Sequence, residues 1–164
     1  MTLDLALVLF LILCNGFFAL SEMSVVTSRK ARLKQQAEES RRAKAALELA
    51  EHPERFLSTV QVGITLIGIL TGMYGGEAIG VRIQALIEPF FDDPDWARNV
   101  GLGISVGLIT FTTIILGELL PKRIALLAPE RIAGVVAMPM NLLSIIATPA
   151  VWLLSFTTRS LLRL

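Results

Sequence analysis

Residues 100–120 read VGLGISVGLITFTTIILGELL, and this stretch decides the fold class of the chain. Glu118 is its only charged residue. An α-helix needs about 20 mostly apolar residues to cross the hydrocarbon core of a bilayer. The whole chain of 164 residues is 54% hydrophobic and only 18% charged, which is too apolar for an ordinary soluble domain of this size. We therefore expect an all-α membrane protein that forms a single transmembrane domain over residues 1–164.

Working outward from this run, the sequence predicts two more membrane spans and two other helical segments. The predicted spans are 3–28, 56–81 and 99–121. No basic residue precedes the first span, so it is expected to be an uncleaved helix and not a signal peptide. Residues 29–52 lack Gly and Pro and predict a cytoplasmic juxtamembrane helix. Residues 130–160 are apolar but contain Pro139 and Pro149, which favours a proline-broken belt or re-entrant segment at the inner interface, with a fourth span as the alternative.

The distribution of charge orients these segments. Basic residues gather in 29–55 and again after the third span, whereas the connection 82–98 is mostly acidic. The basic residues are Arg29, Lys30, Arg32, Lys34, Arg41, Arg42, Lys44 and Arg55, followed by Lys122, Arg123 and Arg131. The acidic residues of the connection are Glu88, Asp92, Asp93 and Asp95. Cytoplasmic loops carry the excess of Lys and Arg. The sequence therefore predicts a multi-pass protein of the cell (inner) membrane with its N-terminus outside and its C-terminus in the cytoplasm. Arg159 and Arg163 would face outside if 132–158 crossed.

The second predicted span carries a ladder of glycines at intervals of four, namely Gly68, Gly72, Gly76 and Gly80. Small residues at this spacing lie on one helix face and let another backbone approach closely. Two interpretations remain open: packing between helices of one chain, or the seam of a homodimer.

The sequence lacks the usual signatures of soluble enzymes. It has no phosphate-binding glycine loop, no zinc-protease motif and no nucleophile elbow. Cys14 and His52 are the only residues of their kinds, which excludes thiolate metal sites and most catalytic triads. We expect no enzyme activity and no nucleic-acid partner.

The run Gly117-Glu118-Leu119-Leu120-Pro121-Lys122 is the strongest functional signal. A carboxylate in a membrane span is costly and usually faces a polar cavity or an ion path. Because Pro121 has no N–H, the carbonyl of Gly117, four residues earlier, loses its helical partner. A carboxylate beside a freed carbonyl offers two hard oxygen ligands for a cation. The alternative is an interfacial Glu118 that reaches toward Lys122, one helical turn further on.

Other spans offer oxygen ligands at a compatible depth. Ser21 and Ser24 share one face of the first helix, while Asn15 and Glu22 share another. Thr65 lies in the second span. Hydroxyl, carbonyl and carboxylate oxygens suit Mg²⁺, Na⁺ or Ca²⁺ and disfavour zinc and copper.

Three motifs together resemble the transmembrane domain of the CorC/cyclin M (CNNM) family of magnesium transporters, which are also described as hemolysin-like. They are Asn15-Gly16-Phe17-Phe18-Ala19-Leu20-Ser21-Glu22-Met23-Ser24, Gln61-Val62-Gly63-Ile64-Thr65-Leu66 and the Gly117–Lys122 run. The resemblance covers essentially the whole chain. It implies a homodimer in the lipid bilayer, Mg²⁺ export driven by Na⁺ entry, and cytoplasmic CBS domains of the same full-length chain that are expected after residue 164.

The resemblance also implies a magnesium site formed by Ser21, Ser24, Thr65, Gly117 and Glu118. Residues with an indirect or sodium-related role would be Asn15, Glu22, Gly68, Pro121 and Lys122. The sequence departs from some family members, which have Asn-Asn at the positions of Ile64-Thr65 and Asn at that of Gly68. This departure puts the ligand from the second span in question. The leading hypothesis is a secondary transporter; its rivals are a membrane anchor or regulatory interaction domain with no transport of its own, and, last, a pore-forming lysin.

Overall fold

The computed structural model describes residues 2–91 and 93–162, and every regular element within them is a helix. In chain order these are α1 (Thr2–Thr27), α2 (Lys30–Ala37), α3 (Arg41–Glu51), α4 (Pro53–Ile87), a 3₁₀ turn η1 (Glu88–Phe90), α5 (Pro94–Thr112), a π-helix η2 (Thr113–Leu119), α6 (Leu120–Leu127) and α7 (Pro129–Leu162). The expected all-α fold class is confirmed for this part of the chain. Asp92 and Arg163, which entered the prediction of orientation, lie outside the described residues.

Four helical stretches are long and apolar enough to cross a membrane: Leu3–Thr27, Pro53–Phe90, Pro94–Leu127 and Pro129–Thr158. Three of them correspond to the predicted spans: two contain 56–81 and 99–121, and the first ends at Thr27, one residue before the end of the predicted 3–28. The fourth is the segment that the sequence favoured as an interfacial belt, so the arrangement of three spans plus a belt stays a prediction. Many large apolar side chains on these helices are exposed, among them Leu13, Leu66, Leu108 and Ile145, as expected of surfaces that face lipid.

The chain divides into two compact units. The first unit comprises residues 1–17 and 65–120, and the second comprises residues 18–64 and 121–164. Each unit combines a part of α1, a part of α4 and a segment from the C-terminal half of the chain.

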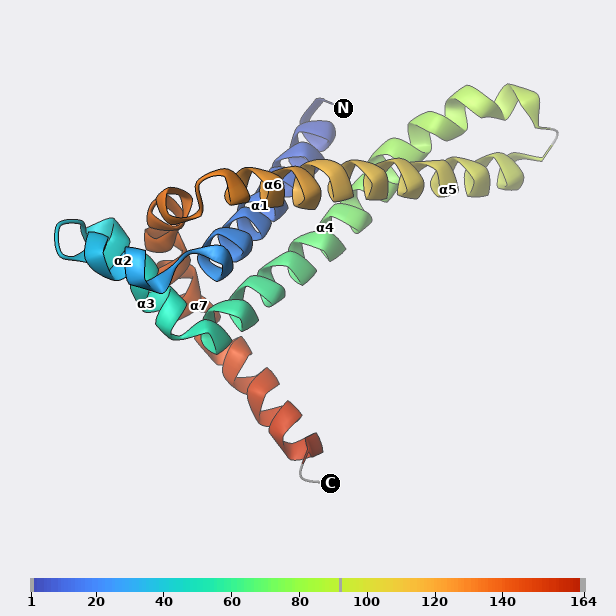
Figure 1. Ribbon diagram of the computed structural model, residues 1–164. Coiled ribbons are helices and arrows are strands. Elements are labelled where there is room, and N and C mark those ends of the chain that lie inside the picture. The colour runs from blue at the N-terminus through green and yellow to red at the C-terminus, as the bar shows by residue number, and fades with distance from the viewer. Residues whose placement is uncertain (1, 92, 163–164) are drawn as a thin grey trace. The chain divides into compact units, whose positions relative to one another are not determined.

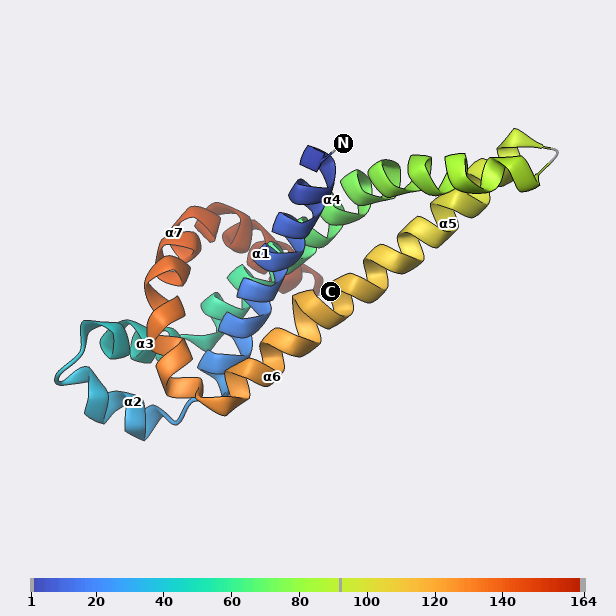
Figure 2. The same cartoon turned by 90° about the horizontal axis from the view of Figure 1, so that it is seen from above.

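In the first unit, the C-terminal part of α4 and α5 form an antiparallel pair that reverses through η1 (Figures 1 and 2). Asp93 caps α5, because its carboxylate accepts a 2.9 Å hydrogen bond from the backbone N–H of Asp95. The two helices approach closely at Gly101. A Cβ built there would lie 2.9 Å from the backbone nitrogen of Gln84 and 3.1 Å from the carbonyl oxygen of Gly80. Only a residue without a side chain permits this spacing.

The glycine ladder of α4 has two different surroundings. Gly76 and Gly80 face α5, where Leu102 is the nearest neighbour of a Cβ added at either position. A Cβ added at Gly68 or Gly72 would meet nothing within 4 Å. Packing within the chain therefore accounts for the second half of the ladder, and the first half presents an open strip of backbone.

In the second unit, the predicted single juxtamembrane helix over 29–52 is wrong, because the segment forms two helices, α2 and α3. The absence of Gly and Pro suggested one helix, but Ser40 interrupts it with an extended backbone (φ −131°, ψ 119°) and caps α3 by accepting from the N–H of Ala43. Serine favours such a position because its oxygen replaces a missing helical acceptor. The apolar face of α3, formed by Ala43, Ala46, Leu49 and Ala50, is buried, and α3 packs against both α2 and α7.

The predicted breaks at Pro139 and Pro149 are also wrong, since both prolines lie inside the continuous helix α7. Figure 2 shows that α7 curves along its length. A proline removes one backbone hydrogen bond and crowds the preceding turn, which bends a helix without ending it when the neighbouring turns are intact. An ion pair of 3.6 Å joins Arg32 of α2 to Glu130 at the start of α7. It connects the two sequence segments of this unit, 18–64 and 121–164.

Candidate cation site

The carbonyl of Gly117 sits in η2, where the helix is wound as a π-helix over Thr113–Leu119. The backbone N–H of Leu120 bonds to the carbonyl of Ile115, five residues earlier. A π-turn is rare, shifts the backbone hydrogen bonds by one residue and is frequent at functional sites. Pro121 follows directly, and its missing N–H favours such an irregular stretch. The backbone irregularity expected near Gly117 is therefore present.

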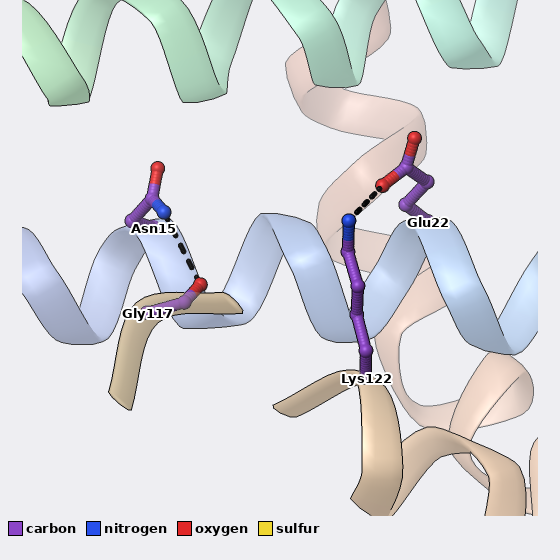
Figure 3. Close-up of polar contacts among 4 residues, drawn as sticks. All are labelled: Asn15, Glu22, Gly117 and Lys122. Atoms are coloured by element: carbon purple, nitrogen blue, oxygen red, sulfur yellow. Dashed lines mark hydrogen bonds and ion pairs between the residues drawn. The ribbon is translucent and has the colours of Figure 1, made fainter. Parts of the chain in front are cut away.

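The Gly117 carbonyl has a specific partner in the first unit, the side-chain amide of Asn15 on α1. Asn15 Nδ2 donates a hydrogen bond of 3.1 Å to it (Figure 3). Both residues are buried, with Asn15 only 2% exposed. The sequence placed Asn15 among the residues with an indirect role, and the structure puts it in direct contact with the proposed ligand carbonyl.

The same place holds two buried oxygens that no described residue satisfies, Oδ1 of Asn15 and Oγ1 of Thr113. A Cβ built at Gly117 would lie 3.1 Å from Asn15 Nδ2 and 3.4 Å from Thr113 Cγ2, so both side chains border the space that the glycine leaves open. A buried polar atom without a partner is costly and points to a ligand, an ion or a water. Thr113 was missed at the level of the sequence, although its spacing of four residues from Gly117 places both on one helix face.

Glu118 is half-buried and adjoins this cluster through the backbone. Within the described part of the first unit, no basic side chain lies within 4.0 Å of its carboxylate. Thr65 belongs to the same unit but its side chain is exposed on α4. The role of Thr65 as a ligand stays a prediction. The departure of the sequence from the family pattern at this position already puts that role in question.

The two predicted serines belong to the second unit and are fully buried. The Ser24 hydroxyl donates a 3.1 Å hydrogen bond to the backbone carbonyl of Ser21, and the Ser28 hydroxyl donates to that of Val25 at 2.9 Å. Such bonds back to the own helix are common for hydroxyls in membrane helices. Donation of this kind does not use the lone pairs of the Ser24 and Ser28 hydroxyl oxygens, which can still accept.

Lys122 pairs with Glu22 across 3.4 Å in the second unit (Figure 3). The alternative interpretation of the Gly117–Lys122 run predicts that Glu118 reaches toward Lys122. In the structure, Lys122 instead forms its ion pair with the carboxylate of Glu22. Glu22 also lines a cavity of about 890 Å³ together with Glu54, Ser58 and Gln61. No group of three or more His, Cys, Asp or Glu side chains suited to a metal occurs in the described part of the chain, so carbonyl, amide and hydroxyl oxygens dominate the candidate donors.

Comparison with known proteins decides the family. Residues 6–164 match the model of the cyclin M transmembrane N-terminal domain. The chain belongs to this family. It is 44% identical over 163 residues, or 99% of the chain, to a UPF0053 protein of Synechocystis sp., of which it covers 36%. It is 32% identical over 151 residues to the UPF0053 inner membrane protein YfjD of Escherichia coli, covering 92% of this chain and 32% of that protein.

A third relative has a functional name. The polyamine export protein of Salmonella typhimurium is 32% identical over 161 residues, which is 95% of this chain and 36% of that protein. The chain spans about a third of the length of these curated relatives. The family and the apolar helices together identify a multi-pass membrane domain, and the predicted family resemblance is confirmed.

Proposed function

We propose that this domain transports Mg²⁺ across the membrane, with Na⁺ as the coupling ion and a cation site built on Gly117 and Glu118. The observation that carries the proposal is the pairing of Asn15 with the Gly117 carbonyl beside two buried oxygens that lack partners. Hard, mostly neutral oxygens suit Mg²⁺, which needs near-octahedral coordination and sheds its water reluctantly. Family membership supports the same assignment.

Each group has a separate role in this mechanism. Glu118 supplies the charge that makes it favourable for a divalent cation to leave water. The Gly117 carbonyl, Asn15 Oδ1 and Thr113 Oγ1 supply dipoles that replace part of the hydration shell. A single nearby carboxylate leaves the ion only half neutralised, which favours release over permanent binding. The resemblance adds Ser21, Ser24 and Thr65 as further oxygen ligands, a homodimer as the working unit, and an orientation with the C-terminus in the cytoplasm.

The decisive experiment measures Mg²⁺ flux in proteoliposomes with an enclosed Mg²⁺-sensitive dye, under an imposed Na⁺ gradient. Glu118→Gln keeps the size of the side chain and removes its charge, so flux should fall to the level of empty liposomes while the protein elutes normally in gel filtration. Glu88→Gln removes an exposed carboxylate from the turn η1 and should transport like the unmodified chain. Flux that survives Glu118→Gln contradicts the proposal.

A second candidate is export of polyamines, which the name of the Salmonella relative suggests. Glu22 and Glu54 line one cavity of about 890 Å³ in the second unit, together with Arg55. Glu54, and Glu22 in exchange for Lys122, can accept the ammonium groups of a linear polycation. The same proteoliposomes distinguish the two: uptake of labelled spermidine that Glu54→Gln abolishes, with no Mg²⁺ flux, would favour the polyamine.

A further inference from the structure

A second cavity in the second unit, of about 310 Å³, is lined by none of the residues assigned above to the cation site. It lies where the last turn of α3, the first turn of α4 and the middle of α7 meet, and its polar lining includes His52, Arg55, Asn141 and Ser144. Its apolar lining is Leu49, Phe56 and Ile145. The walls of the cavity are thus partly charged or polar and partly apolar. Such a composition is typical of the zone where lipid headgroups meet hydrocarbon.

Ser144 supplies the first indication of a ligand. Its side chain is 6% exposed, and its hydroxyl has no hydrogen-bond partner among the described residues. Its backbone carbonyl, in contrast, accepts a hydrogen bond of 2.8 Å from the hydroxyl of Thr148. A buried hydroxyl that lines a cavity and has no partner in the protein requires one from outside.

Arg55 supplies the charge. Its Nη2 donates a hydrogen bond of 2.8 Å to the hydroxyl of Thr148, which fixes the guanidinium against α7. No carboxylate of a described residue lies within 4.0 Å of it, so its positive charge is uncompensated at this distance. Arg55 also stands in the first turn of the 35-residue helix α4, where unpaired backbone N–H groups and the helix dipole favour an anion.

The cavity also contains one negative group, Glu48 of α3. A ligand with several negative charges would be repelled by it, whereas a ligand that carries one anionic and one cationic group would satisfy both Arg55 and Glu48. The aliphatic and aromatic lining would cover the apolar part of such a molecule.

From these observations we infer that the cavity binds a zwitterionic phosphate ester of the phosphoethanolamine type. The phosphate accepts hydrogen bonds from Arg55, Ser144 and the amide of Asn141, and the ammonium group contacts Glu48. The chemistry is shared by a membrane phospholipid headgroup and by its soluble glycerophosphoethanolamine counterpart. Its lining includes no residue of the proposed cation site, although Arg55 also lines the larger cavity that contains Glu22 and Glu54.

Native mass spectrometry of the detergent-purified chain tests this inference. Phosphatidylethanolamine, phosphatidylglycerol and soluble glycerophosphoethanolamine are added separately, and the bound fraction is measured for each. We expect preferential retention of an ethanolamine ligand. Loss of one hydrogen bond to a charged group weakens binding by about tenfold, so Arg55→Gln and Ser144→Ala should each reduce retention by about this factor. Preference for the lipid or for the soluble ester identifies the source.

Arg41→Gln is the matched control for Arg55→Gln, because Arg41 is an exposed arginine of the neighbouring helix α3 and does not line the cavity. It should bind like the unmodified chain. Glu48→Gln should remove the preference for ethanolamine over glycerol headgroups. Equal losses in Arg41→Gln and Arg55→Gln, undiminished retention in Ser144→Ala, or no retention of either ethanolamine ligand would overturn the inference. Gel filtration of each variant separates a lost site from a lost fold.

Discussion

Asn15 and Gly117 are 102 residues apart in the sequence, yet the Asn15 amide donates to the Gly117 carbonyl at 3.1 Å and fixes α1 against the π-helix of the first unit. Glycine favours this contact, because a Cβ at residue 117 would lie 3.1 Å from the amide nitrogen and 3.4 Å from the carbonyl oxygen of Ile12, and these neighbours would have to shift by a few tenths of an ångström. The contact therefore depends on two sequence features at once: an amide on one helix and a missing side chain on another.

Removing the amide should destabilise the chain. Asn15→Ala leaves the buried Gly117 carbonyl without this donor, and an unsatisfied buried group costs about 1–3 kcal/mol. We expect a clearly lower midpoint of thermal unfolding in detergent. Asn99→Ala removes an exposed amide from α5 and should leave the midpoint nearly unchanged; an equal shift in both variants would show that the contact contributes little.

Adding a methyl group at the site should impair transport more than folding. Gly117→Ala forces Asn15 to move by a few tenths of an ångström, which displaces both the amide and its unpaired oxygen. We expect reduced Mg²⁺ flux in proteoliposomes with correct gel-filtration behaviour. Gly107→Ala is the control, since its Cβ would meet nothing within 4 Å and alanine improves helix propensity by about 1 kcal/mol. Normal flux in Gly117→Ala would argue against a site built on this carbonyl.

The ion pair of Glu22 and Lys122 should be weakly stabilising. The two side chains are 29% and 37% exposed and 3.4 Å apart, and exposed pairs contribute about 0–1 kcal/mol. A double-mutant cycle with Glu22→Gln and Lys122→Gln, read by thermal unfolding at low and high salt, should give a small coupling that salt reduces. A large coupling that salt does not change would mean that the pair is shielded from solvent.

The cap at Ser40 should control the order of α3. Ser40→Ala removes the acceptor for the Ala43 N–H, at a typical cost of about 1 kcal/mol. Hydrogen exchange should accelerate at the first turn of α3, and Ser40→Asp should restore slow exchange because aspartate is an equally good cap. Exchange that is equally slow in all three chains would contradict the assignment of the cap.

The open half of the glycine ladder tests the proposed homodimer. A Cβ at Gly72 meets nothing within the chain, so Gly72→Leu should fold, but it would fill a surface where a second copy approaches closely. Chemical cross-linking in membranes should give fewer dimers. Gly76→Ala, which faces Leu102 of the same chain at 3.7 Å, should leave the dimer yield unchanged, and an unaltered yield for Gly72→Leu would exclude this strip as the seam.

The sequence was sufficient for the all-α fold class and for the irregular backbone beside Gly117, whereas the assignment of a cation site there stays a prediction. Long apolar runs around Glu118 require helices, and the step from Gly117 to Pro121 predicted the irregular backbone that η2 contains. Local signals failed where tertiary contacts decide. Ser40 divides the juxtamembrane segment by capping α3, and α3 then packs against α7, whereas the absence of Gly and Pro alone predicts one continuous helix.

Other site residues could not be predicted because they depend on partners far away in the sequence. The role of Asn15 as a donor requires knowledge that α1 meets η2 at Gly117. Thr113 is one of several hydroxyl residues in the span, and nothing in its local sequence shows that its oxygen is buried without a partner. Conversely, Pro139 and Pro149 predict breaks in α7 that do not occur, because sequence alone does not show whether the flanking turns are supported.

Helix α4 has a consequence for the membrane itself. Its 35 residues at 1.5 Å per residue give a length of about 52 Å, whereas the hydrocarbon core of a bilayer is about 30 Å thick. A helix with this excess must tilt, project into water or thicken the lipid around it, each at a modest cost per ångström of mismatch. We therefore expect the tilt of α4 to depend on the thickness of the host bilayer. Reconstitution in lipids of different chain length would change this tilt without any change in the sequence.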